Sequence, residues 1–293
     1  MRKFIAVLLA GAMCLSLAAC GSSSKKGAAD STKAAEQSTE TSGSDWEYIK
    51  GKGEMVVGMT LFEPMNYYDK DNKFVGFDTE VTKAVAKKLG VKVKFTEIDW
   101  DSKEIELNSK NIDAIWNGMC STPERQKNMS CTEPYLYNDQ VMVMKKDREK
   151  EIISDLKGKT VTCEAGSTGE GKIQGTIPDD ESTKVSAKKF FADANYVASD
   201  SMAKAVMEVE SGTADLAVID SVCAYGMVRP DSNYKDLVVN ADNMFGQQQY
   251  VAAFRKGSDV TEKVNKALDE LYADGTINKI AQKYGLEKAL IQK

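Results

Sequence analysis

Residues 110–119, KNIDAIWNGM, and residues 212–221, GTADLAVIDS, follow the same pattern. Each stretch places an aspartate, Asp113 or Asp215, directly before a short apolar run that ends in small or polar side chains. A short apolar run bounded in this way is typical of a buried strand. The repetition predicts two similarly built halves that face each other across a cleft, with polar groups at the strand ends.

The residues before the first of these strands predict an alternation of strands and helices. Residues 55–60, MVVGMT, form an apolar run, and the charged group DKDNK at 69–73 is typical of a hairpin turn. A helix is expected after a cap at Asp78 and before Gly90, and VKVKF at 91–95 alternates as a strand with one buried face. A short helix at about 102–109 completes a β-α-β-α-β order. This order predicts an α/β fold with a largely parallel sheet and helices on both faces.

The second half repeats this order after a charged stretch, residues 145–158, which is interpreted as a surface connection. The strand KTVTC, 159–163, leads into a glycine turn in EAGSTGEGK, 164–172, and then into a helix. Apolar residues between 202 and 209 mark a further helix before the second repeat. Residues 260–285 predict two amphipathic helices at the carboxyl end.

The amino terminus has the features of an export signal. MRK is followed by an apolar run from Phe4 to Ala19, and LAAC ends at Cys20. Residues 21–45 contain no large apolar side chain, which is typical of a flexible linker. Residues 1–19 resemble a bacterial lipoprotein signal, and this resemblance implies a lipid on Cys20 and a location on the outer face of the cell membrane. An ordinary secretory signal with a chance cysteine is the alternative.

The charge of the chain excludes one class of partner. The full sequence has 39 basic and 44 acidic side chains, and loss of Arg2 and Lys3 with the signal leaves 37 basic groups and a formal charge of −7. An acidic protein of this kind is a poor binder of nucleic acid. The folded part of roughly 250 residues suits two domains.

Four cysteines remain after Cys14 and Cys20 are set aside: Cys120, Cys131, Cys163 and Cys223. Their spacing lacks the CxxC pairs of zinc sites. Buried thiols, or one or two disulfides in an oxidising compartment, are the two interpretations that stay open.

The absence of histidine from the sequence limits the possible chemistry. Ser-His-Asp and Cys-His arrangements and HExxH metal sites are excluded. Cys120 lacks an evident base that would make it a nucleophile. Gly166, Gly171 and Lys172 match the start of a phosphate-binding loop, but Ile173 stands where a hydroxyl would hold magnesium. We therefore expect a binding protein without a metal or cofactor, and not an enzyme.

Five motifs resemble the family 3 extracellular solute-binding proteins, the amino-acid-binding proteins of ABC importers. They are FVGFDTEVTKAVAKKLG, NGMCSTPERQKNMSCTEPY, DLKGKTVTCEAGSTGE, GTADLAVIDS and FRKGSDVTEKVNKALDELYADGTINKIAQKYG, in this order from about Glu54 to Gly285. The resemblance implies a two-lobed, type II periplasmic-binding-protein-like fold with the ligand in the cleft between the lobes. Two hinge strands would lie near 137–141 and 247–250. Lobe 1 would contain residues 46–138 and 250–293, and lobe 2 would contain residues 139–249.

The same resemblance implies a site for the head group of an amino acid. Arg125 would pair with the α-carboxylate, Gly118 and Cys120 would offer backbone amides, and Asp220 would accept the α-ammonium. Cys120 departs from the serine or threonine usual there, so only its amide is inferred. The family further implies that Ser167 and Thr168 reach the carboxylate from lobe 2, and that Phe62 and Trp100 enclose the ligand side chain. Ordinary core packing is the alternative for both aromatic residues.

The identity of the ligand depends on three other residues. Met59 stands where many members that bind cationic amino acids have an acid, whereas Glu164 lies where the family varies with the ligand side chain. Asn117 offers a neutral donor and acceptor. A polar or cationic L-amino acid is expected, although Glu164 has the alternative of a solvated loop carboxylate.

The combined interpretation is a monomeric, lipid-anchored receptor that passes a free L-amino acid to the permease of an ABC transporter. An enzyme on the same fold, such as a cyclohexadienyl dehydratase, and a sensory receptor without a transport role are the alternatives.

Overall fold

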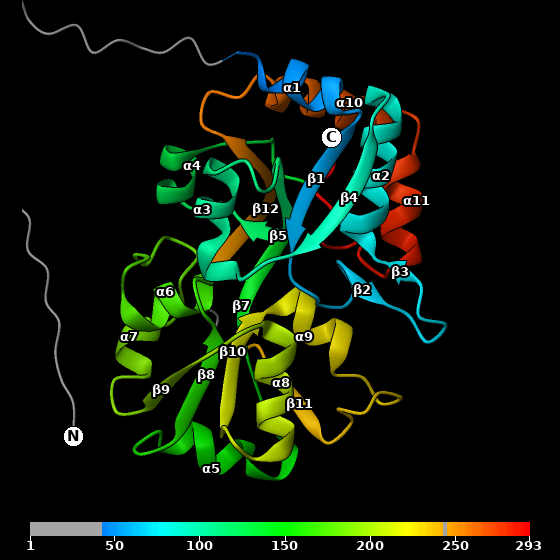
Figure 1. Cartoon of the computed structure of the whole chain (residues 1–293). Helices are drawn as coiled ribbons and strands as arrows, with labels where there is room; N and C mark the ends of the chain where they lie inside the picture. Colours follow the sequence, from blue (N-terminus) through cyan, green and yellow to red (C-terminus); the bar gives the residue numbers. More distant parts are fainter. Residues whose placement is uncertain (1–42, 243–244) are drawn as a thin grey trace, which may run out of the picture. The chain divides into compact units, whose positions relative to one another are not determined.

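Two groups of strands and helices, which we call lobe 1 and lobe 2, are joined by two long strands (Figure 1). The computed structural model describes residues 43–242 and 245–293, which belong to one compact unit. The predicted export signal at 1–19, the lipidation of Cys20 and the linker up to residue 42 lie outside the described residues.

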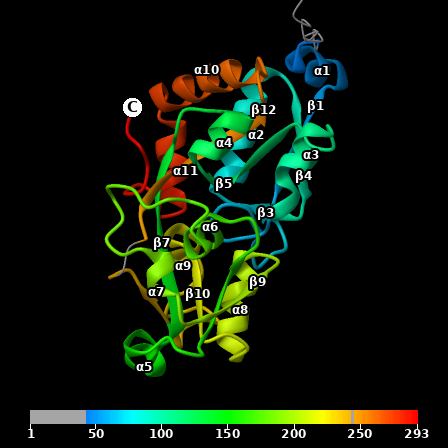
Figure 2. The same cartoon turned by 90° about the vertical axis from the view of Figure 1, so that its left-hand side faces the viewer.

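Lobe 1 is built on three parallel strands, β1, β4 and β5. Helices cover both faces of this sheet, with α2, α10 and α11 on one face and α3 and α4 on the other (Figures 1 and 2). The elements of lobe 1 are α1 (Asp45–Lys52), β1 (Glu54–Met59), β2 (Tyr67–Tyr68), β3 (Phe74–Val75), α2 (Phe77–Leu89), β4 (Lys92–Glu97), the 3₁₀ helix η1 (Trp100–Ser102), α3 (Lys103–Asn108), β5 (Ala114–Cys120), α4 (Pro123–Asn128), β6 (Met129–Cys131), α10 (Val260–Ala273) and α11 (Thr276–Lys283).

Lobe 2 repeats this plan, with β8 parallel to both β10 and β9. The added strand β11 lies antiparallel to β7. The elements of lobe 2 are the 3₁₀ helix η2 (Lys146–Arg148), α5 (Glu149–Ser154), β8 (Thr160–Glu164), α6 (Thr168–Gln174), α7 (Ala187–Phe190), β9 (Asn195–Ser199), α8 (Met202–Ser211), β10 (Leu216–Asp220), α9 (Ser221–Met227) and β11 (Leu237–Asn240).

Two antiparallel strands, β7 (Leu136–Lys145) and β12 (Gln247–Arg255), run from one lobe into the other. The first residues of β7 pair with β12, and its later residues pair with β10 and β11. The resulting strand order is β4-β1-β5-β12-β7-β10-β8-β9. The expectation of a largely parallel sheet is therefore correct within each lobe and wrong for the strands that connect the lobes.

The repeated aspartates of the sequence have the same structural role in both lobes. Asp113 accepts a hydrogen bond from the Val56 amide at 2.8 Å, and Asp215 accepts one from the Thr160 amide at 2.8 Å. In each pair the aspartate's own amide donates back to the carbonyl of the same partner, at 2.7 Å and 2.9 Å. Each aspartate thus sets the register between two parallel strands. It lies at the ends of these strands that are remote from the cleft.

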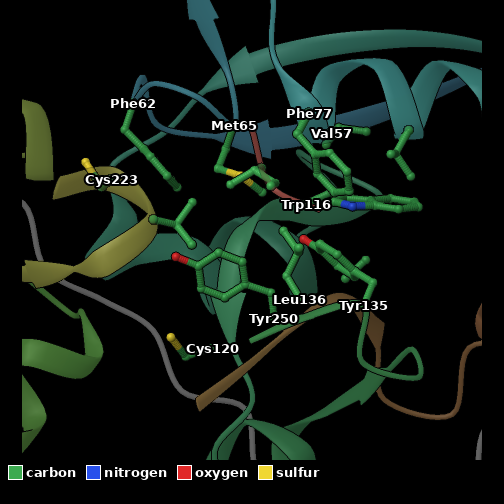
Figure 3. Packing of buried hydrophobic residues seen from close by; sticks show 14 of the residues in the cluster. Val57, Phe62, Met65, Phe77, Trp116, Cys120, Tyr135, Leu136, Cys223 and Tyr250 are labelled. Carbon is green, nitrogen blue, oxygen red and sulfur yellow. The ribbon is translucent and has the colours of Figure 1, made fainter. Parts of the chain in front are cut away.

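Alternating side chains along β5 divide the core of lobe 1 into two clusters. Ala114 and Trp116 pack in the cluster that contains Phe77, whereas Ile115 and Met119 pack in the cluster that contains Trp100. Figure 3 shows part of the first cluster, with Trp116, Phe77 and Tyr135 at one end and Phe62, Tyr250 and Cys120 at the other.

Several local predictions can be compared with these elements. β2 and β3 form the predicted hairpin, and Gly90 ends α2 in a left-handed conformation with φ 73°. The predicted cap at Asp78 is wrong, because Gly76 holds that position and the Asp78 side chain is buried elsewhere. The charged connection at 145–158 contains α5, because Ile152 of that segment is buried in the core of lobe 2.

The four cysteines of the described residues are unpaired thiols. Cys120, Cys163 and Cys223 are buried, and Cys131 is partly exposed. The interpretation as thiols is therefore confirmed over disulfides, with burial complete for three of the four. None of the helices within the described ranges has the length and apolar character that a membrane span requires.

Candidate functional site

The predicted site residues lie at the carboxyl ends of strands from both lobes. In lobe 1, β5 ends at Cys120 and is followed by α4, which carries Arg125. In lobe 2, β8 ends at Glu164 and β10 ends at Asp220. Ligands of open α/β sheets bind beyond the carboxyl ends of the strands. The two sets of strand ends meet through hydrogen bonds between the lobes.

Arg125 makes the central contact between the lobes. Its guanidinium is buried, and it is positioned by α4, where Thr122 caps the helix by accepting a hydrogen bond from the Arg125 amide at 3.2 Å. Nη1 donates to the Cys120 carbonyl at 2.8 Å and to Thr168 Oγ1 at 3.4 Å, and Nη2 donates to the Gly166 carbonyl at 3.0 Å. All of these acceptors are neutral.

A second buried cation, Lys103, shares one of these acceptors. Nζ of Lys103 donates to the carbonyl of Gly166 and to that of Trp100, each at 3.0 Å. Burial and, to a smaller extent, the charge of Arg125 lower the pKa of Lys103 to about 8. The sequence offered no signal for this residue, because a lysine in a short helix is ordinarily solvent-exposed.

Asp220 forms the acidic counterpart of Arg125 in lobe 2. Its carboxylate is buried and accepts hydrogen bonds from the Gln140 amide and from the Tyr250 hydroxyl, the latter at 2.6 Å. Burial raises the pKa of Asp220, although both hydrogen bonds oppose this shift. Gln140 and Tyr250 belong to the connecting strands β7 and β12, and sequence reasoning missed both.

Glu164 is a buried acid and not a solvated loop residue. Only 2% of it is exposed, and Oε1 has no hydrogen-bond partner among the described residues. Burial and, to a smaller extent, the nearby charge of Asp220 raise the pKa of Glu164 to about 8. A cationic group placed beside Glu164 would offset both effects.

Cys120 lies between the guanidinium of Arg125 and the carboxylate of Asp220. Its carbonyl accepts from Arg125, and its thiol lies 3.8 Å from Asp220 Oδ2 and 3.7 Å from Asn138 Nδ2. Burial and the charge of Asp220 raise the pKa of the Cys120 thiol well above its usual range. The thiol is therefore protonated, as expected for a residue that does not act as a nucleophile.

Asn117 has a structural role that differs from its predicted one. Its Oδ1 accepts from the amide and the hydroxyl of Thr60, each at 2.9 Å, and its Nδ2 donates to the Thr60 carbonyl and to Asn66 Oδ1, each at 2.8 Å. These four bonds use the full hydrogen-bonding capacity of the amide. The contact of Asn117 with the ligand side chain stays a prediction, for which the amide has no hydrogen-bonding group left in this arrangement.

The Gly118 amide is also occupied. It donates to Asp78 Oδ2 at 2.6 Å, and the same oxygen accepts from the Tyr135 hydroxyl at 3.0 Å. Carboxylate binding by this amide stays a prediction and would require the bond to Asp78 to be exchanged. Gly118 is required for another reason: its φ is 56°, and a Cβ there would lie 2.8 Å from the Phe62 ring.

The two aromatic residues lie in separate clusters. Phe62 belongs to the large core cluster, which also contains Tyr250 (Figure 3), and the rings of both residues lie beside Gly118. Trp100 belongs to the cluster on the opposite face of β5, and its ring centroid lies 5.1 Å from Lys103 Nζ. Core packing thus accounts for much of the burial of both residues.

Ser167 and Thr168 begin α6 on the lobe 2 side. Ser167 Oγ caps this helix by accepting from the Glu170 amide at 3.2 Å, whereas Thr168 Oγ1 faces Arg125. Both residues are buried. The structure therefore brings Arg125, Cys120, Thr168, Glu164 and Asp220 to one region, with the Ser167 hydroxyl committed to its helix.

Comparisons with known proteins place the chain in a family. The family model of the bacterial extracellular solute-binding proteins, family 3, matches residues 55–287. The chain belongs to this family.

Two curated relatives match this solute-binding protein over nearly its whole length. An arginine-binding extracellular protein of Bacillus subtilis (strain 168) is 31% identical over 285 residues, which cover 97% of this chain and 98% of the relative. An L-cystine-binding protein of the same organism is 32% identical over 288 residues, covering 97% of each.

A solved structure shares the fold. The crystal structure of an ancestral amino acid-binding protein, described as a precursor of cyclohexadienyl dehydratase, matches with a TM-score of 0.69 and 31% identity. The match covers 82% of this chain and 99% of that one.

One hollow in this solute-binding protein is lined by none of these charged residues. It has a volume of about 730 Å³ and is lined by residues that include Tyr137, Tyr225 and Arg229. The charge of Arg229 is neutralised there by Glu63 at 2.9 Å. A smaller hollow of about 320 Å³ is lined by Arg125, Lys103, Gly166 and Ser167, among others. We assign the candidate site by its unneutralised charges, because volume alone does not distinguish a binding site from an open groove.

Within the residues that the structure describes, no group of three or more cysteine or acidic side chains is arranged to hold a metal ion.

Proposed function

We propose that this solute-binding protein captures a polar or cationic L-amino acid between its lobes and presents it to the permease of an ABC importer. The names of the relatives, which include arginine- and cystine-binding proteins and a probable amino-acid ABC transporter-binding protein, support the class of ligand and the role in transport.

The observation that carries the proposal is the separation of unneutralised charges. Arg125 and Lys103 donate only to neutral acceptors, and Asp220 accepts only from neutral donors. In the described ranges, none of these three side chains forms a salt bridge. Buried charges are ordinarily paired. A zwitterion supplies the missing partners, with its carboxylate at Arg125 and its ammonium at Asp220.

Glu164 supports a ligand that carries a second positive charge or a strong hydrogen-bond donor. Its unpartnered, buried Oε1 lies in the same region as Asp220. A guanidinium, an ammonium or an imidazolium near Glu164 would lower the energy of the ionised acid. Small apolar and acidic ligands would leave Glu164 unpaired, so we rank them last.

The register of the connecting strands supports the proposed boundaries, with residues 46–138 and 250–293 in lobe 1 and residues 139–249 in lobe 2. β7 exchanges β12 for β10 as its partner between Asp139 and Gln140. Closure would bring Thr168 and Glu164 to the ligand held by Arg125. A ligand that contacts both lobes favours the closed state through contacts absent when the lobes are apart.

The remaining parts of the proposal concern the setting of the protein. We propose a monomer that is anchored through a lipid on Cys20 to the outer face of the cell membrane, with the permease as its partner. A sensory receptor would use the same site, and transport of a labelled ligand by cells with and without this protein would separate the two roles.

We further propose that the protein is not an enzyme. Histidine is absent from the sequence, and the Cys120 thiol is protonated. The fold shared with a dehydratase precursor keeps the enzyme alternative open to test. Release of product from prephenate or arogenate would support the enzyme, whereas binding without turnover supports the receptor.

A thermal-shift screen of the twenty amino acids tests the main proposal, because a ligand that binds the folded state raises its apparent stability. We expect the largest shifts for cationic and polar L-amino acids, and no shift for D-enantiomers at the same concentration. An absence of any shift with all twenty would contradict the proposed function.

A further inference from the structure

Two buried cations of lobe 1 share one neutral acceptor of lobe 2. Nζ of Lys103 and Nη2 of Arg125 both donate to the carbonyl oxygen of Gly166 at 3.0 Å. Lys103 is 5% exposed and Arg125 is 6% exposed. Two like charges on a single carbonyl, in surroundings of low dielectric, repel each other more strongly than they would in water.

The acids around Lys103 do not cancel this repulsion. Within the described residues, neither Lys103 nor Arg125 takes part in a salt bridge. No carboxylate of these residues therefore lies within 4.0 Å of Lys103 Nζ or of the Arg125 guanidinium. The Trp100 ring, 5.1 Å from Nζ, offsets part of the cost of burial. The charged groups that act on Lys103 come from each neighbouring element and are Asp101 of η1, Glu104 of α3, Arg125 of α4 and Glu164 of β8.

We propose that Lys103 determines selectivity for ligands with a carboxylate, because its charge beside Arg125 opposes closure of an empty cleft. The inference rests on the proposed function, in which Arg125 receives the α-carboxylate. A carboxylate between the lobes neutralises the repulsion and adds charge-assisted hydrogen bonds. A ligand without a carboxylate leaves both cations uncompensated, so the lobes close on it less readily. Lys103 is a positioning residue in this account, because it acts through its repulsion of Arg125.

The first experiment compares ligands that differ only by the carboxylate. L-Arginine and agmatine, its decarboxylated form, are titrated calorimetrically into wild type, Lys103→Met and Lys103→Arg. We expect the ratio of their affinities to fall about tenfold in Lys103→Met, a coupling in the usual range between linked sites. The Lys103→Arg variant retains the charge and the wild-type ratio. L-Histidine and histamine form a second pair if arginine is not bound.

An unchanged ratio in Lys103→Met, with wild-type binding of the amino acid intact, would overturn the inference. A merely structural lysine would weaken both ligands of a pair equally, and this result would overturn it as well. Circular-dichroism melting of both variants checks that they fold.

The second experiment measures closure without a ligand by small-angle X-ray scattering. Lys103→Met should give a smaller radius of gyration than wild type, because the variant lacks the repelling charge, and Lys103→Arg should not. Lys103 in an open cleft would have the ordinary lysine pKa of about 10.4. Its pKa is about 8 where Nζ is buried against Gly166 of lobe 2, so bringing the lobes together without a ligand releases a proton between these values. Closure of wild type should therefore increase from pH 8 to 9 relative to Lys103→Arg.

The difference between the two proteins is the measured quantity, because Glu164, Asp220 and Cys120 have raised pKa values and shift closure in the opposite direction. Equal radii for wild type and Lys103→Met at every pH would overturn the inference. If wild type binds no amino acid, the proposed function fails, and the scattering comparison alone decides the effect of Lys103.

Discussion

Nη2 of Arg125 in lobe 1 lies 3.0 Å from the carbonyl oxygen of Gly166 in lobe 2. The contact joins the segment that follows β5 in lobe 1 to the turn that follows β8 in lobe 2, so the carboxyl ends of one strand from each lobe meet at one guanidinium. A carbonyl satisfies a hydrogen bond of this group and leaves its charge uncompensated. The position is therefore suited to a ligand carboxylate that both lobes can reach.

Arg125→Ala should abolish amino-acid binding and leave a folded protein. Removal of the partner of a desolvated carboxylate costs ~2–5 kcal/mol of binding free energy. Calorimetric titration of the ligand found in the thermal-shift screen measures the loss. Arg148→Ala is the matched control, because Arg148 forms a surface ion pair with Asp215 at 2.7 Å outside the cleft. Binding by Arg125→Ala within a few-fold of wild type would place the head group elsewhere.

Asp220→Asn should weaken binding from the lobe 2 side. The substitution keeps the shape of the side chain and removes the charge that would face the α-ammonium, which is worth ~1.5–3 kcal/mol for a charged hydrogen bond. Affinity for the same ligand is compared with that of Asp215→Asn, which alters the strand contact to Thr160 and leaves the cleft untouched. Equal affinities for wild type and Asp220→Asn would reject Asp220 as the ammonium partner.

Glu164→Gln should change the ranking of ligands and remove a pH dependence. Burial raises the pKa of Glu164 to about 8 in this structure, and a cationic ligand side chain beside it lowers that pKa, so binding of such a ligand releases a proton below about pH 8. Affinity for arginine should therefore rise as the pH approaches about 8 and then level off, and Glu164→Gln should show no such rise from this residue.

Competition among arginine, lysine, histidine, glutamine and cystine provides the readout for Glu164. We expect Glu164→Gln to lose affinity for the cationic ligands and to keep that for glutamine. A uniform loss across all five, or no loss, would show that Glu164 does not contact the ligand side chain.

Asn117→Ala should destabilise the fold without a comparable effect on the choice of ligand. Its amide makes four buried hydrogen bonds to Thr60 and Asn66, and each partner left unsatisfied costs ~1–3 kcal/mol. Denaturant unfolding measures the free energy of unfolding. Asn128→Ala, which removes one exposed hydrogen bond to Glu104, is the control. A strong change in ligand ranking at unchanged stability would return Asn117 to the binding site.

Cys131 should react first with a thiol reagent. It is the partly exposed thiol of the four, whereas Cys120 is buried and its raised pKa keeps it protonated. Peptide mass spectrometry after timed alkylation identifies the modified residues. Modification of Cys120 should become slower still with ligand, because closure covers it. Fast modification of Cys120 in the liganded protein would contradict its position inside the cleft.

The local pattern of the sequence determined the two-lobed plan. The apolar runs after Asp113 and Asp215 are strands, and each aspartate bonds to the neighbouring parallel strand in the same way. Such local signals can be recognised in the sequence, because each depends on residues that are close in the sequence or that lie on directly paired strands. The hairpin between β2 and β3 and the end of α2 at Gly90 follow from the same kind of signal.

Tertiary structure alone decided which polar groups stay free for a ligand. Asn117 and the Gly118 amide lie in the motif that resembles the binding segment of the family, yet Thr60, Asn66 and Asp78 use their hydrogen bonds. Conversely, Lys103 belongs to none of the sequence motifs, yet its ammonium group reaches the cleft and donates to a neutral carbonyl without forming a salt bridge among the described residues. Satisfaction of a buried polar group depends on partners that folding brings together from distant parts of the chain, and a sequence pattern carries no record of those partners.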